Sequence, residues 1–382
     1  MSEVPASCLV FSFDYPPNDG GIARFCASLA EANANRGLRV SVLAQDVPGG
    51  RSAENRPVVE TVQISGSRLS RDLAAFRRLI GSSDESVVVA GIWYPEGLIA
   101  TLAGVRPLVI LAHGSELMPT IEAWRRGIWR QLARWVLSRA DLVVANSSYT
   151  LDLVQRLAPR SSGVAIPLGV DVNRFCPGDR VAAREAMGVD GLLVISTVAR
   201  LVRYKGHGVV LRALANLDSE LQERVVYLVA GDGPDRLRLE TLSEELGVRA
   251  RVRWLDFLPE SDLPMLYRAS DLFVLCSREE QGRQEVEGFG LAFLEAQACG
   301  TPVVGTRTGG IPDAVKEGEG GWLIEQNDHV SLTEILRRLV EQPELFRQAG
   351  AVARARVVRG CTWDQYVSRL WRELEKKGVG SV

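Results

Sequence analysis

The sequence lacks the features that mark several classes of protein. Its six cysteines form no C-x-x-C pair, and with only three histidines in the chain there is no His/Cys cluster. This argues against structural zinc and a disulfide framework, and it fits a reducing cytoplasm. No apolar run approaches the ~20 residues of a membrane-spanning helix, and the N-terminal segment has no basic start before its short apolar run. We therefore expect a cytoplasmic protein, soluble or at most peripheral to a membrane.

The sequence also lacks an excess of one charge and several catalytic signatures. Its 45 Lys and Arg and 47 Asp and Glu give a formal net charge of −2, so we expect no nucleic-acid partner. It contains no Asp-x-Asp pair, and we expect neither a metal ion nor another cofactor. It has no G-x-S-x-G elbow, and the absence of a full G-x-G-x-x-G pattern disfavours dinucleotide binding.

Apolar strand-like runs alternate with helical patterns along the whole chain. Its 382 residues exceed what one hydrophobic core usually serves, so we expect two domains. The predicted strands are 8–13, 39–43, 87–90, 107–112, 142–145, 192–199, 225–230, 252–255, 272–276 and 301–305. The predicted helices include 22–35, 121–139, 207–216, 235–246 and 331–341. This alternation predicts an α/β fold with two doubly wound, Rossmann-like halves, each holding a parallel sheet.

The stretch AIPLGVDVNRFCPGDR (165–180) interrupts the alternation with proline, glycine and charge. We place the domain boundary there, giving an N-terminal domain of residues 1–172 and a C-terminal domain of residues 173–362. A last helical pattern within 363–382 is expected to pack back on the first domain. Ligands of such sheets bind at the carboxyl ends of the strands, so the cleft between the halves is the expected site.

The stretch EVEGFGLAFLE (285–295) combines two carboxylates with two glycines at a predicted helix start. Gly288 and Gly290 suit a loop whose backbone approaches a ligand closely. The amides at the helix start can bind a phosphate, and Glu287 and Glu295 can accept hydrogen bonds from sugar hydroxyls. The alternative is a glycine-rich turn before an ordinary amphipathic helix with one solvated carboxylate.

The stretch ARLVRYKGHG follows the predicted strand 192–199 and carries Arg200 and Lys205. Two fixed cations at the carboxyl end of a parallel strand suit a diphosphate, to which they donate charge-assisted hydrogen bonds. Because no magnesium site is evident, these cations and the helix amides would have to hold the charge of a departing diphosphate. The alternative is a solvated basic loop.

Two stretches of the first half are candidates for the other side of the cleft. DYPPNDGGIARF places Gly20 and Gly21 at a turn that opens a helix, where a sugar or phosphate can approach the backbone. LAHGSE places His113 at the carboxyl end of a strand, where it can donate to a sugar hydroxyl or orient an acceptor. Each feature alone also fits a structural role, as a tight turn or as a satisfied strand-end histidine.

Together these residues resemble the retaining glycosyltransferases of family 4, which have the GT-B fold. The order PPNDGGIARF, HGSE, PLGVDVNRF, ARLVRYKG, VAGDGP, EVEGFGLAFLE, ACGTPVV and GGIPD covers nearly the whole chain. The block RQEVEGFGLAFLEAQACGTPVV is especially similar to bacterial phosphatidylinositol mannosyltransferases and their exopolysaccharide-building relatives. The resemblance implies sugar transfer from a nucleoside diphosphate with retained anomeric configuration, in which the departing phosphate takes the acceptor's proton.

The resemblance implies a role for each candidate side chain. Arg200 and Lys205 would bind the diphosphate, Glu295 the ribose and Glu287 the transferred sugar, while His113 would contact a hydroxyl of that sugar. Of these, His113, Glu287, Arg200 and Lys205 would form the catalytic set.

Other donor-binding positions would contribute backbone or apolar surface. These are Gly20, Gly21, Leu258, Phe289, Gly290 and Leu291. The two glycines would approach the phosphate and the acceptor, the three residues from 289 to 291 would hold the transferred sugar, and Leu258 would lie near the nucleobase. The family often has glycine where this chain has Asp256.

The segment 121–140 predicts a basic amphipathic helix. Its apolar face is formed by Ile121, Trp124, Ile128, Leu132 and Trp135. Arg126, Arg130 and Arg134 recur on the opposite face. A basic helix with tryptophans can lie on anionic lipid, so a membrane surface is a candidate partner. We favour packing of the apolar face on the sheet, which leaves the three arginines for a membrane or a phosphorylated acceptor.

Several functions remain open. The fold also suits a nucleotide-sugar epimerase or a non-catalytic sensor of nucleotide sugars. A glycoside hydrolase is disfavoured because eight helical positions separate two carboxylates by roughly 12 Å. Among transferases, a UDP-glucose or other UDP-hexose donor and a glycan or lipid-linked acceptor are preferred. A GDP-mannose-dependent mannosyltransferase that acts on a phosphatidylinositol-type or other lipid acceptor is the alternative.

Overall fold

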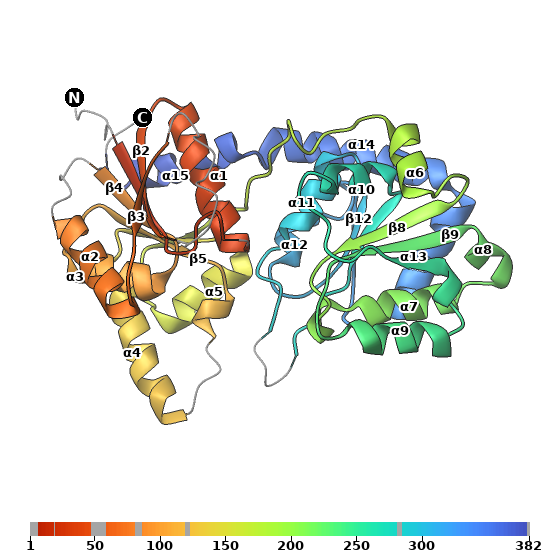
Figure 1. Cartoon of the computed structure of the whole chain (residues 1–382), viewed down its shortest axis with the longest axis horizontal. Helices are drawn as coiled ribbons and strands as arrows, with labels where there is room; N and C mark the ends of the chain where they lie inside the picture. The colour runs from red at the N-terminus through yellow and green to blue at the C-terminus, as the bar shows by residue number, and fades with distance from the viewer. Residues whose placement is uncertain are drawn as a thin grey trace. The chain divides into compact units, whose positions relative to one another are not determined.

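The computed structural model describes residues 7–18, 20–46, 59–80, 86–118, 123–280 and 285–379. The chain forms two compact units, each with its own sheet and core (Figure 1). Unit 1 consists of Met1–Pro167 and Trp363–Val382, and unit 2 consists of Leu168–Thr362. The division at Pro167 lies inside the proline- and glycine-rich linker, slightly before the boundary that the sequence suggested at residue 172.

Unit 1 is built on a seven-stranded parallel sheet with the strand order β3-β2-β1-β4-β5-β6-β7. Its strands are β1 (Ser7–Phe11), β2 (Arg39–Gln45), β3 (Val59–Ile64), β4 (Ser86–Ala90), β5 (Leu108–Ala112), β6 (Leu142–Ala145) and β7 (Gly163–Ala165). Because these strands point the same way, their carboxyl ends share one edge of the sheet. The loops after β1 and β5 begin at that edge and carry the candidate residues of this unit.

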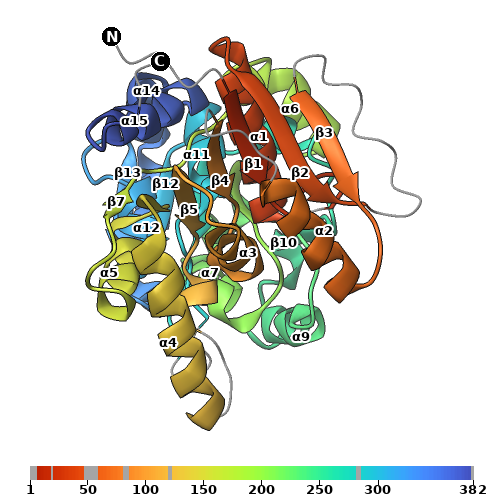
Figure 2. The ribbon, with the colours of Figure 1, turned by 90° about the vertical axis from the view of Figure 1, so that its left-hand side faces the viewer.

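Helices cover the sheet of unit 1 (Figure 2). They are α1 (Gly21–Asn35), α2 (Arg68–Ile80), the π-type turn η1 (Trp93–Gly97), α3 (Leu98–Leu102), the 3-10 turn η2 (Ser115–Leu117), α4 (Ala123–Arg139), α5 (Ser148–Leu157) and α15 (Trp363–Glu375). Helices α2 to α5 share one apolar core with the strands. α15 packs on α1, where the indole nitrogen of Trp371 donates a hydrogen bond to Asn33 at 2.8 Å.

Unit 2 is built on a six-stranded parallel sheet with the strand order β10-β9-β8-β11-β12-β13. Its strands are β8 (Leu193–Val198), β9 (Val225–Ala230), β10 (Val252–Trp254), β11 (Leu272–Leu275), β12 (Val303–Thr306) and β13 (Gly321–Ile324). Its helices and helical turns are α6 (Arg180–Met187), η3 (Arg203–Lys205), α7 (His207–Ala215), α8 (Ser219–Glu223), α9 (Arg236–Glu245), η4 (Arg249–Arg251), α10 (Leu263–Ala269), α11 (Leu291–Ala298), α12 (Ile311–Ala314), α13 (His329–Glu341) and α14 (Pro343–Gly360).

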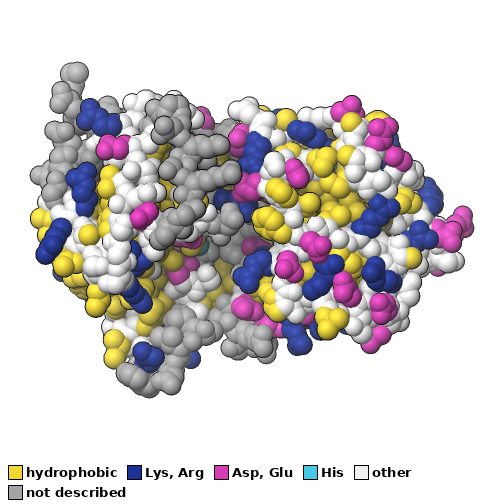
Figure 3. All heavy atoms as spheres, viewed as in Figure 1, with side chains coloured by type: hydrophobic (Ala, Val, Ile, Leu, Met, Phe, Trp, Pro, Cys, Tyr) yellow, Lys and Arg dark blue, Asp and Glu magenta, His cyan; other side chains and the backbone are white. Residues whose placement is uncertain are grey.

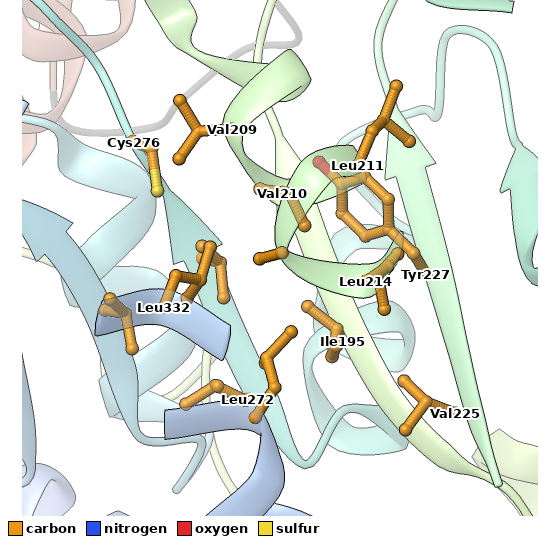
Figure 4. Close-up of a cluster of buried hydrophobic side chains, with 14 of the residues drawn as sticks. Ile195, Val209, Val210, Leu211, Leu214, Val225, Tyr227, Leu272, Cys276 and Leu332 are labelled. Atoms are coloured by element: carbon orange, nitrogen blue, oxygen red, sulfur yellow. The ribbon is translucent and has the colours of Figure 1, made fainter. Parts of the chain in front are cut away.

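The core of unit 2 joins its central strands to the helices beside them (Figure 4). Ile195 of β8 and Leu272 of β11 lie in this cluster with Leu211 of α7 and Leu332 of α13, and each of these four residues is 0% exposed. The central strands are apolar on both sides because helices cover both faces of the sheet. This rigid centre positions the loops that leave the strands at their carboxyl ends.

The predicted α/β class and the two parallel, Rossmann-like sheets are confirmed. The ten predicted strands agree with observed strands to within two residues at either end. Three strands were missed, β3, β7 and β13, and all three lie at an edge of a sheet. An edge strand has a neighbour on one side only, and β3 and β7 are half-buried or exposed at most positions. Their sequences therefore lack the continuous apolar run that marks the central strands.

Candidate functional site

The loop after β8 carries Arg200 and is held in place by the loop after β9. Gly231 has a φ angle of 138°, and a Cβ atom there would lie 2.0 Å from the carbonyl oxygen of Ala199. The stretch VAGDGP therefore needs glycine where the two loops touch. Arg200 itself is exposed, at the carboxyl end of the strand as the sequence expected.

Lys205 and Glu287 are in direct contact. The Nζ atom of Lys205 donates to Oε2 of Glu287 at 2.5 Å, and the two side chains are 14% and 13% exposed. Burial lowers the pKa of Lys205, but the Glu287 carboxylate and Tyr204 outweigh burial and raise it. The lysine is therefore a cation in a partly dehydrated place, where charge-assisted hydrogen bonds are strong. The structure brings together the side chains that were expected to hold the diphosphate and the transferred sugar.

The start of α11 is fixed by close backbone contacts. Gly290 has a φ angle of 89°, in the left-handed region, and a Cβ atom there would lie 2.6 Å from the ring of Phe293. The carbonyl oxygen of Glu287 accepts a hydrogen bond from the amide of Gly310, in the stretch GGIPD, at 2.9 Å. Three residues here were expected to hold the sugar. Phe289 is buried, and Gly290 and Leu291 are half-buried.

Glu295 points into the core of unit 2. The residue is 6% exposed, and its Oε2 atom accepts a hydrogen bond from the hydroxyl of Tyr267 at 2.8 Å. Tyr267 is buried and packs edge-on against Phe175 and Phe273. Glu295 therefore has a structural partner that the sequence did not reveal, and its contact with a ribose stays a prediction.

The segment around Leu258 explains an unusual residue of this chain. Leu258 is half-buried against a small apolar cluster of unit 2. Asp256 has a φ angle of 53°, a left-handed conformation that glycine adopts easily and that aspartate tolerates better than most residues. Its carboxylate binds Arg236 at 2.7 Å, and its carbonyl oxygen accepts from the amide of Gly231 at 2.7 Å. Both the left-handed backbone and the carbonyl contact with Gly231 could equally be supplied by a glycine at this position.

One positioning residue of unit 2, His207, was missed by the sequence reasoning. It is 2% exposed, and its Nε2 atom lies 3.3 Å from the carbonyl oxygen of Arg200, which can only accept a hydrogen bond. Burial lowers the pKa of His207 to about 4, so the ring is neutral near pH 7. It supports the backbone of Arg200 from inside. The only signal in the sequence was its place directly after the Lys205-Gly206 pair.

In unit 1 the loops after β1 and β5 come together. A Cβ atom at Gly20 would lie 3.4 Å from the carboxylate of Asp14, whereas Gly21 has open space around it. Burial raises the pKa of Asp14, and the nearby His113 lowers it in part. The structure thus gathers Gly20 and His113 around an aspartate that the sequence had not singled out.

The ring of His113 is held by its Nε2 atom. That atom lies 2.8 Å from the carbonyl oxygen of Gly91, so it carries a proton and donates. The backbone amide of His113 donates to Glu116 at 2.6 Å, and the ring packs edge-on against Phe25 with centroids 5.4 Å apart. In the neutral form the ring therefore offers Nδ1 as an acceptor, where the sequence had suggested a donor.

A cavity of about 660 Å³ opens at the same edge of unit 1. Its charged and amide lining residues are Asp14, Asn18, Gln45, Arg68, Arg71 and Glu96. Glu96 is 2% exposed; its Oε1 atom accepts from the amide of Phe13 at 2.9 Å, and its Oε2 atom has no hydrogen-bond partner among the described residues. Burial raises the pKa of Glu96 to about 7. A group of this kind can accept from a ligand hydroxyl, or donate to it when protonated.

Little in the sequence pointed to this cavity. Glu96 is the single acidic residue of the apolar stretch GIWYPEGLIA, where it resembles a turn residue. Arg68 and Arg71 belong to a helix that the sequence reasoning did not predict. The cavity therefore combines residues from separate elements that no short motif connects.

Comparison with known proteins decides the family. Residues 19–174 match the model of glycosyltransferase family 4, and residues 183–356 match that of glycosyl transferases group 1. A GDP-mannose-dependent alpha-(1-6)-phosphatidylinositol monomannoside mannosyltransferase of Mycolicibacterium smegmatis is 30% identical over 95% of this chain and 96% of its own length. The chain belongs to glycosyltransferase family 4.

Other proteins resemble the chain over shorter stretches or in fold. A D-inositol 3-phosphate glycosyltransferase of Corynebacterium jeikeium is 35% identical over 64% of this chain and 60% of its own. The crystal structure of Anabaena HepE in complex with UDP matches with a TM-score of 0.78 at 20% identity, covering 97% of this chain and 99% of that one. This family 4 glycosyltransferase therefore has the GT-B fold, as the resemblance implied.

The predicted face of α4 in this glycosyltransferase is wrong in part. Ile128 and Trp135 were expected to pack on the sheet, yet they are 67% and 39% exposed. The helix instead buries the face that includes Ala133, Val136 and Leu137. The prediction favoured the largest apolar side chains, whereas the buried face uses a small alanine that lets the helix approach its neighbours.

The arginines of α4 lie on its exposed surface. Arg126, Arg130 and Arg134 are all exposed, and Nε of Arg134 also donates to the carbonyl oxygen of Leu157 at 3.1 Å. Ile121 lies outside the described residues, and nothing is described of the side chain of Trp124. In Figures 1 and 2, the N-terminal turns of α4 extend beyond the other helices of unit 1.

Metal ligands and membrane spans are both absent from the described residues. Within them, no three His, Cys, Asp or Glu side chains come together as metal ligands would. No helix in the described part of the chain combines the length and the apolar character needed to cross a bilayer.

Proposed function

We propose that this glycosyltransferase moves a hexose from a nucleoside-diphosphate sugar to a phosphate-bearing acceptor, with retention of configuration and without a metal ion. The contact between Lys205 and Glu287 carries the proposal. It joins a permanent cation to a carboxylate beside the start of α11, whose first amides can bind an anion. These are the groups that a sugar diphosphate needs at its charged end and at its hydroxyl-bearing end.

The reaction follows from this charge arrangement. The bond between the anomeric carbon and the diphosphate oxygen breaks, and a bond to the acceptor oxygen forms on the same face of the sugar. The acceptor proton passes to a phosphate oxygen of the leaving group. Arg200 and Lys205, with the α11 amides, would stabilise the growing charge on the diphosphate, so the protein need not supply a nucleophile. Glu287 would hold the sugar hydroxyls.

The relatives favour GDP-mannose as the donor. The sequence alone slightly favoured UDP-glucose or another UDP-hexose, as used in exopolysaccharide synthesis. The mannosyltransferase of M. smegmatis, however, aligns with nearly the whole chain, whereas the UDP-bound HepE is similar only at 20% identity. We therefore place GDP-mannose first, with UDP-hexoses as the matched alternative.

The cavity of unit 1 suits a phosphorylated polyol as the acceptor. Arg68 is exposed at its rim and donates to the hydroxyl of Tyr94 at 2.8 Å, while Arg71 lies 3.9 Å above the ring of Phe13. Guanidinium groups bind phosphate oxygens well, and the buried Glu96 offers to a hydroxyl an oxygen that has no partner among the described residues. The headgroup of an inositol phospholipid combines both kinds of group.

The outer helices of unit 1 suit the surface of an anionic membrane. The large apolar side chains that unit 1 exposes among its described residues all lie on α2, η1, α3 and α4. They are Leu69, Leu73, Ile80, Tyr94, Leu102, Ile128 and Trp135. Figure 3 shows hydrophobic side chains gathered on the lower left of unit 1, where Figure 1 places these helices.

The charge of these helices fits the same partner. Helices α2 and α4 carry nine arginines within Arg68–Ile80 and Ala123–Arg139, and Asp72 is the one acidic residue in these two ranges. Exposed apolar side chains beside arginines are typical of helices that lie on anionic lipid. We propose that this face holds the enzyme reversibly at the cytoplasmic face of a membrane, where a lipid acceptor would be met.

The test is transfer from labelled donors to anionic lipid vesicles. We expect label from GDP-mannose to enter phosphatidylinositol in the presence of EDTA, and the product to keep the anomeric configuration of the donor by NMR. Preferential use of UDP-glucose would change the proposed donor from GDP-mannose to a UDP-hexose. Loss of activity in EDTA that manganese restores, or an inverted product, would overturn the corresponding part of the proposal.

A further inference from the structure

A second cavity lies at the opposite edge of the unit 2 sheet, where the strands begin. It has a volume of about 310 Å³ and is lined by the start of β8, the residues before β9 and β11, and side chains of α6 and α14. The predicted donor loops leave the carboxyl ends of the same strands. The six residues of β8 separate the two edges by roughly 20 Å, so this cavity is not part of the predicted donor site.

Arginine dominates the lining of this cavity, which we call the arginine pocket. Its charged residues are Arg180, Arg184, Arg224, Arg347 and Asp271. Asp271 binds Arg180 at 2.5 Å and Arg184 at 3.1 Å, and its carboxylate also accepts from the amide of Val194 at 2.8 Å. One buried carboxylate thus binds two of the four guanidinium groups that line the pocket.

A structural role accounts for only two of the four arginines. Arg180 donates to the carbonyl oxygen of Ser270, and Arg184 donates to that of Ala269, so these side chains tie α6 to the segment before β11. Arg224 makes no side-chain hydrogen bond or ion pair within the described part of the chain. Arg347 is 61% exposed and pairs with Glu344 at the surface. Both are turned to the pocket without being needed to hold the fold.

The charge of the pocket is not balanced. Burial lowers the pKa of Arg180, Asp271 partly compensates for it, and repulsion from Arg184 and Arg347 adds to the lowering. With Asp271 and Glu344 as the acidic partners, four cations face two anions. A bound anion would relieve this repulsion, which acts on Arg180, a side chain that is 37% exposed.

We propose that the arginine pocket is a second anion site that binds the phosphate or diphosphate group of a small phosphorylated compound. Guanidinium groups match phosphate oxygens in charge and in paired hydrogen-bond geometry. The volume lies at the lower end of the range for small-molecule sites. A Cβ atom at Gly191, which lines the rim, would meet no atom within 4 Å, so the entrance is open on that side.

The test is titration calorimetry with inorganic pyrophosphate on the full chain. The double variant Arg224→Ala, Arg347→Ala leaves the Asp271 contacts intact, and we expect it to bind pyrophosphate at least tenfold more weakly at the pocket. A Lys205→Ala background weakens the predicted donor site, so pyrophosphate binding that persists in this background and is lost on adding the double variant reports the pocket. Sugar transfer by the double variant should be unchanged.

A matched control replaces two other arginines of unit 2, the exposed Arg249 and the half-buried Arg337, with alanine. It changes the net charge equally but leaves the pocket intact, and it should bind pyrophosphate like the wild type. Equal affinity of the double variant and this control would overturn the proposal. So would the loss of all pyrophosphate binding in the Lys205→Ala background. Inorganic phosphate and pyrophosphate, titrated in parallel, distinguish a single phosphate site from a diphosphate site.

Discussion

The predicted donor residues of unit 2 and the cavity of unit 1 differ in how their charges are balanced. In unit 2, Lys205 and Glu287 neutralise each other at 2.5 Å, so two ionised groups coexist in a half-buried place. In unit 1, Glu96 is buried with one oxygen unpaired among the described residues, and its pKa rises to about 7. Unit 2 thus offers fixed charges, which suit a diphosphate. Unit 1 offers a carboxyl that changes its protonation state near neutral pH.

The largest expected effect tests the fixed charges of unit 2. Replacing Lys205 with alanine removes a preorganised cation and leaves Glu287 without its partner, so sugar transfer should fall by roughly a hundredfold to a thousandfold. Initial rates measured over a range of donor concentrations check this. Lys316→Ala, which removes a half-exposed lysine of the same unit, is the matched control and should leave the rate unchanged. A Lys205→Ala enzyme with nearly full activity would remove this residue from the site.

The next prediction is that the free energy of unfolding depends on pH with opposite signs in the two units. The folded pKa of Glu96 lies near 7 against 4.5 in a model compound, so the free energy of unfolding of unit 1 should fall as pH rises from 4.5 through 7. The folded pKa of His207 lies near 4, against 6.5 in a model compound. The free energy of unfolding of unit 2 should therefore fall as pH drops from 6.5 to 4. At about 1.4 kcal/mol per pKa unit, each effect reaches at most about 3.5 kcal/mol.

Hydrogen exchange resolved along the chain measures this contrast, with β4 reporting on unit 1 and β8 on unit 2. Glu96→Gln should remove most of the pH dependence of the free energy of unfolding of unit 1 and leave the pH dependence of unit 2 unchanged. A smaller slope of the same sign should remain, because burial also raises the pKa of Asp14. His207→Gln, which keeps a donor for the carbonyl oxygen of Arg200, should do the reverse. Parallel slopes in the two units would contradict the assignment of these groups.

The same contrast explains how much the sequence could predict. The residues of unit 2 lie in short motifs whose spacing the strand-loop-helix unit dictates, so Arg200, Lys205 and Glu287 could be named and placed at the carboxyl edge. The cavity of unit 1 joins Asp14, Arg71 and Glu96 from three different loops and helices. Their proximity depends on strand order, which composition and periodicity do not reveal.

The orientation of single side chains was also beyond the sequence. Glu295 occupies its expected helical position, but its carboxylate meets Tyr267 inside the core. Ile128 and Trp135 follow a helical period, but the helix buries a different face. In both cases the deciding neighbour comes from a distant part of the chain. Local pattern therefore predicted the elements, while packing decided which side of each element is free.

A smaller effect separates the two glutamates of unit 2. Glu287→Ala should weaken binding of the sugar nucleotide about tenfold and leave the affinity for the free nucleoside diphosphate nearly intact. Glu295→Ala should weaken both ligands, because a hydrogen bond from a ribose hydroxyl to a carboxylate is worth roughly 1.5–3 kcal/mol. Titration calorimetry with both ligands checks this. Tyr267→Phe removes the structural hydrogen bond of Glu295 alone. If it weakened both ligands as much as Glu295→Ala does, Glu295 would act only by supporting the core.

The smallest expected effect is on membrane binding by the outer surface of unit 1. Each arginine near an anionic bilayer is worth about 1 kcal/mol, so Arg130→Ala should lower partitioning onto anionic vesicles about fivefold. Binding should weaken further as salt rises, since charges are screened over about 10 Å at ordinary ionic strength. Arg156→Ala, on α5, removes another exposed arginine of the same unit and should change partitioning far less. Donor affinity should be the same in both variants, because neither arginine is among the predicted donor residues. Co-sedimentation at two salt concentrations provides the measurement, and equal binding of the wild type to neutral and anionic vesicles would leave α4 as a packing helix alone.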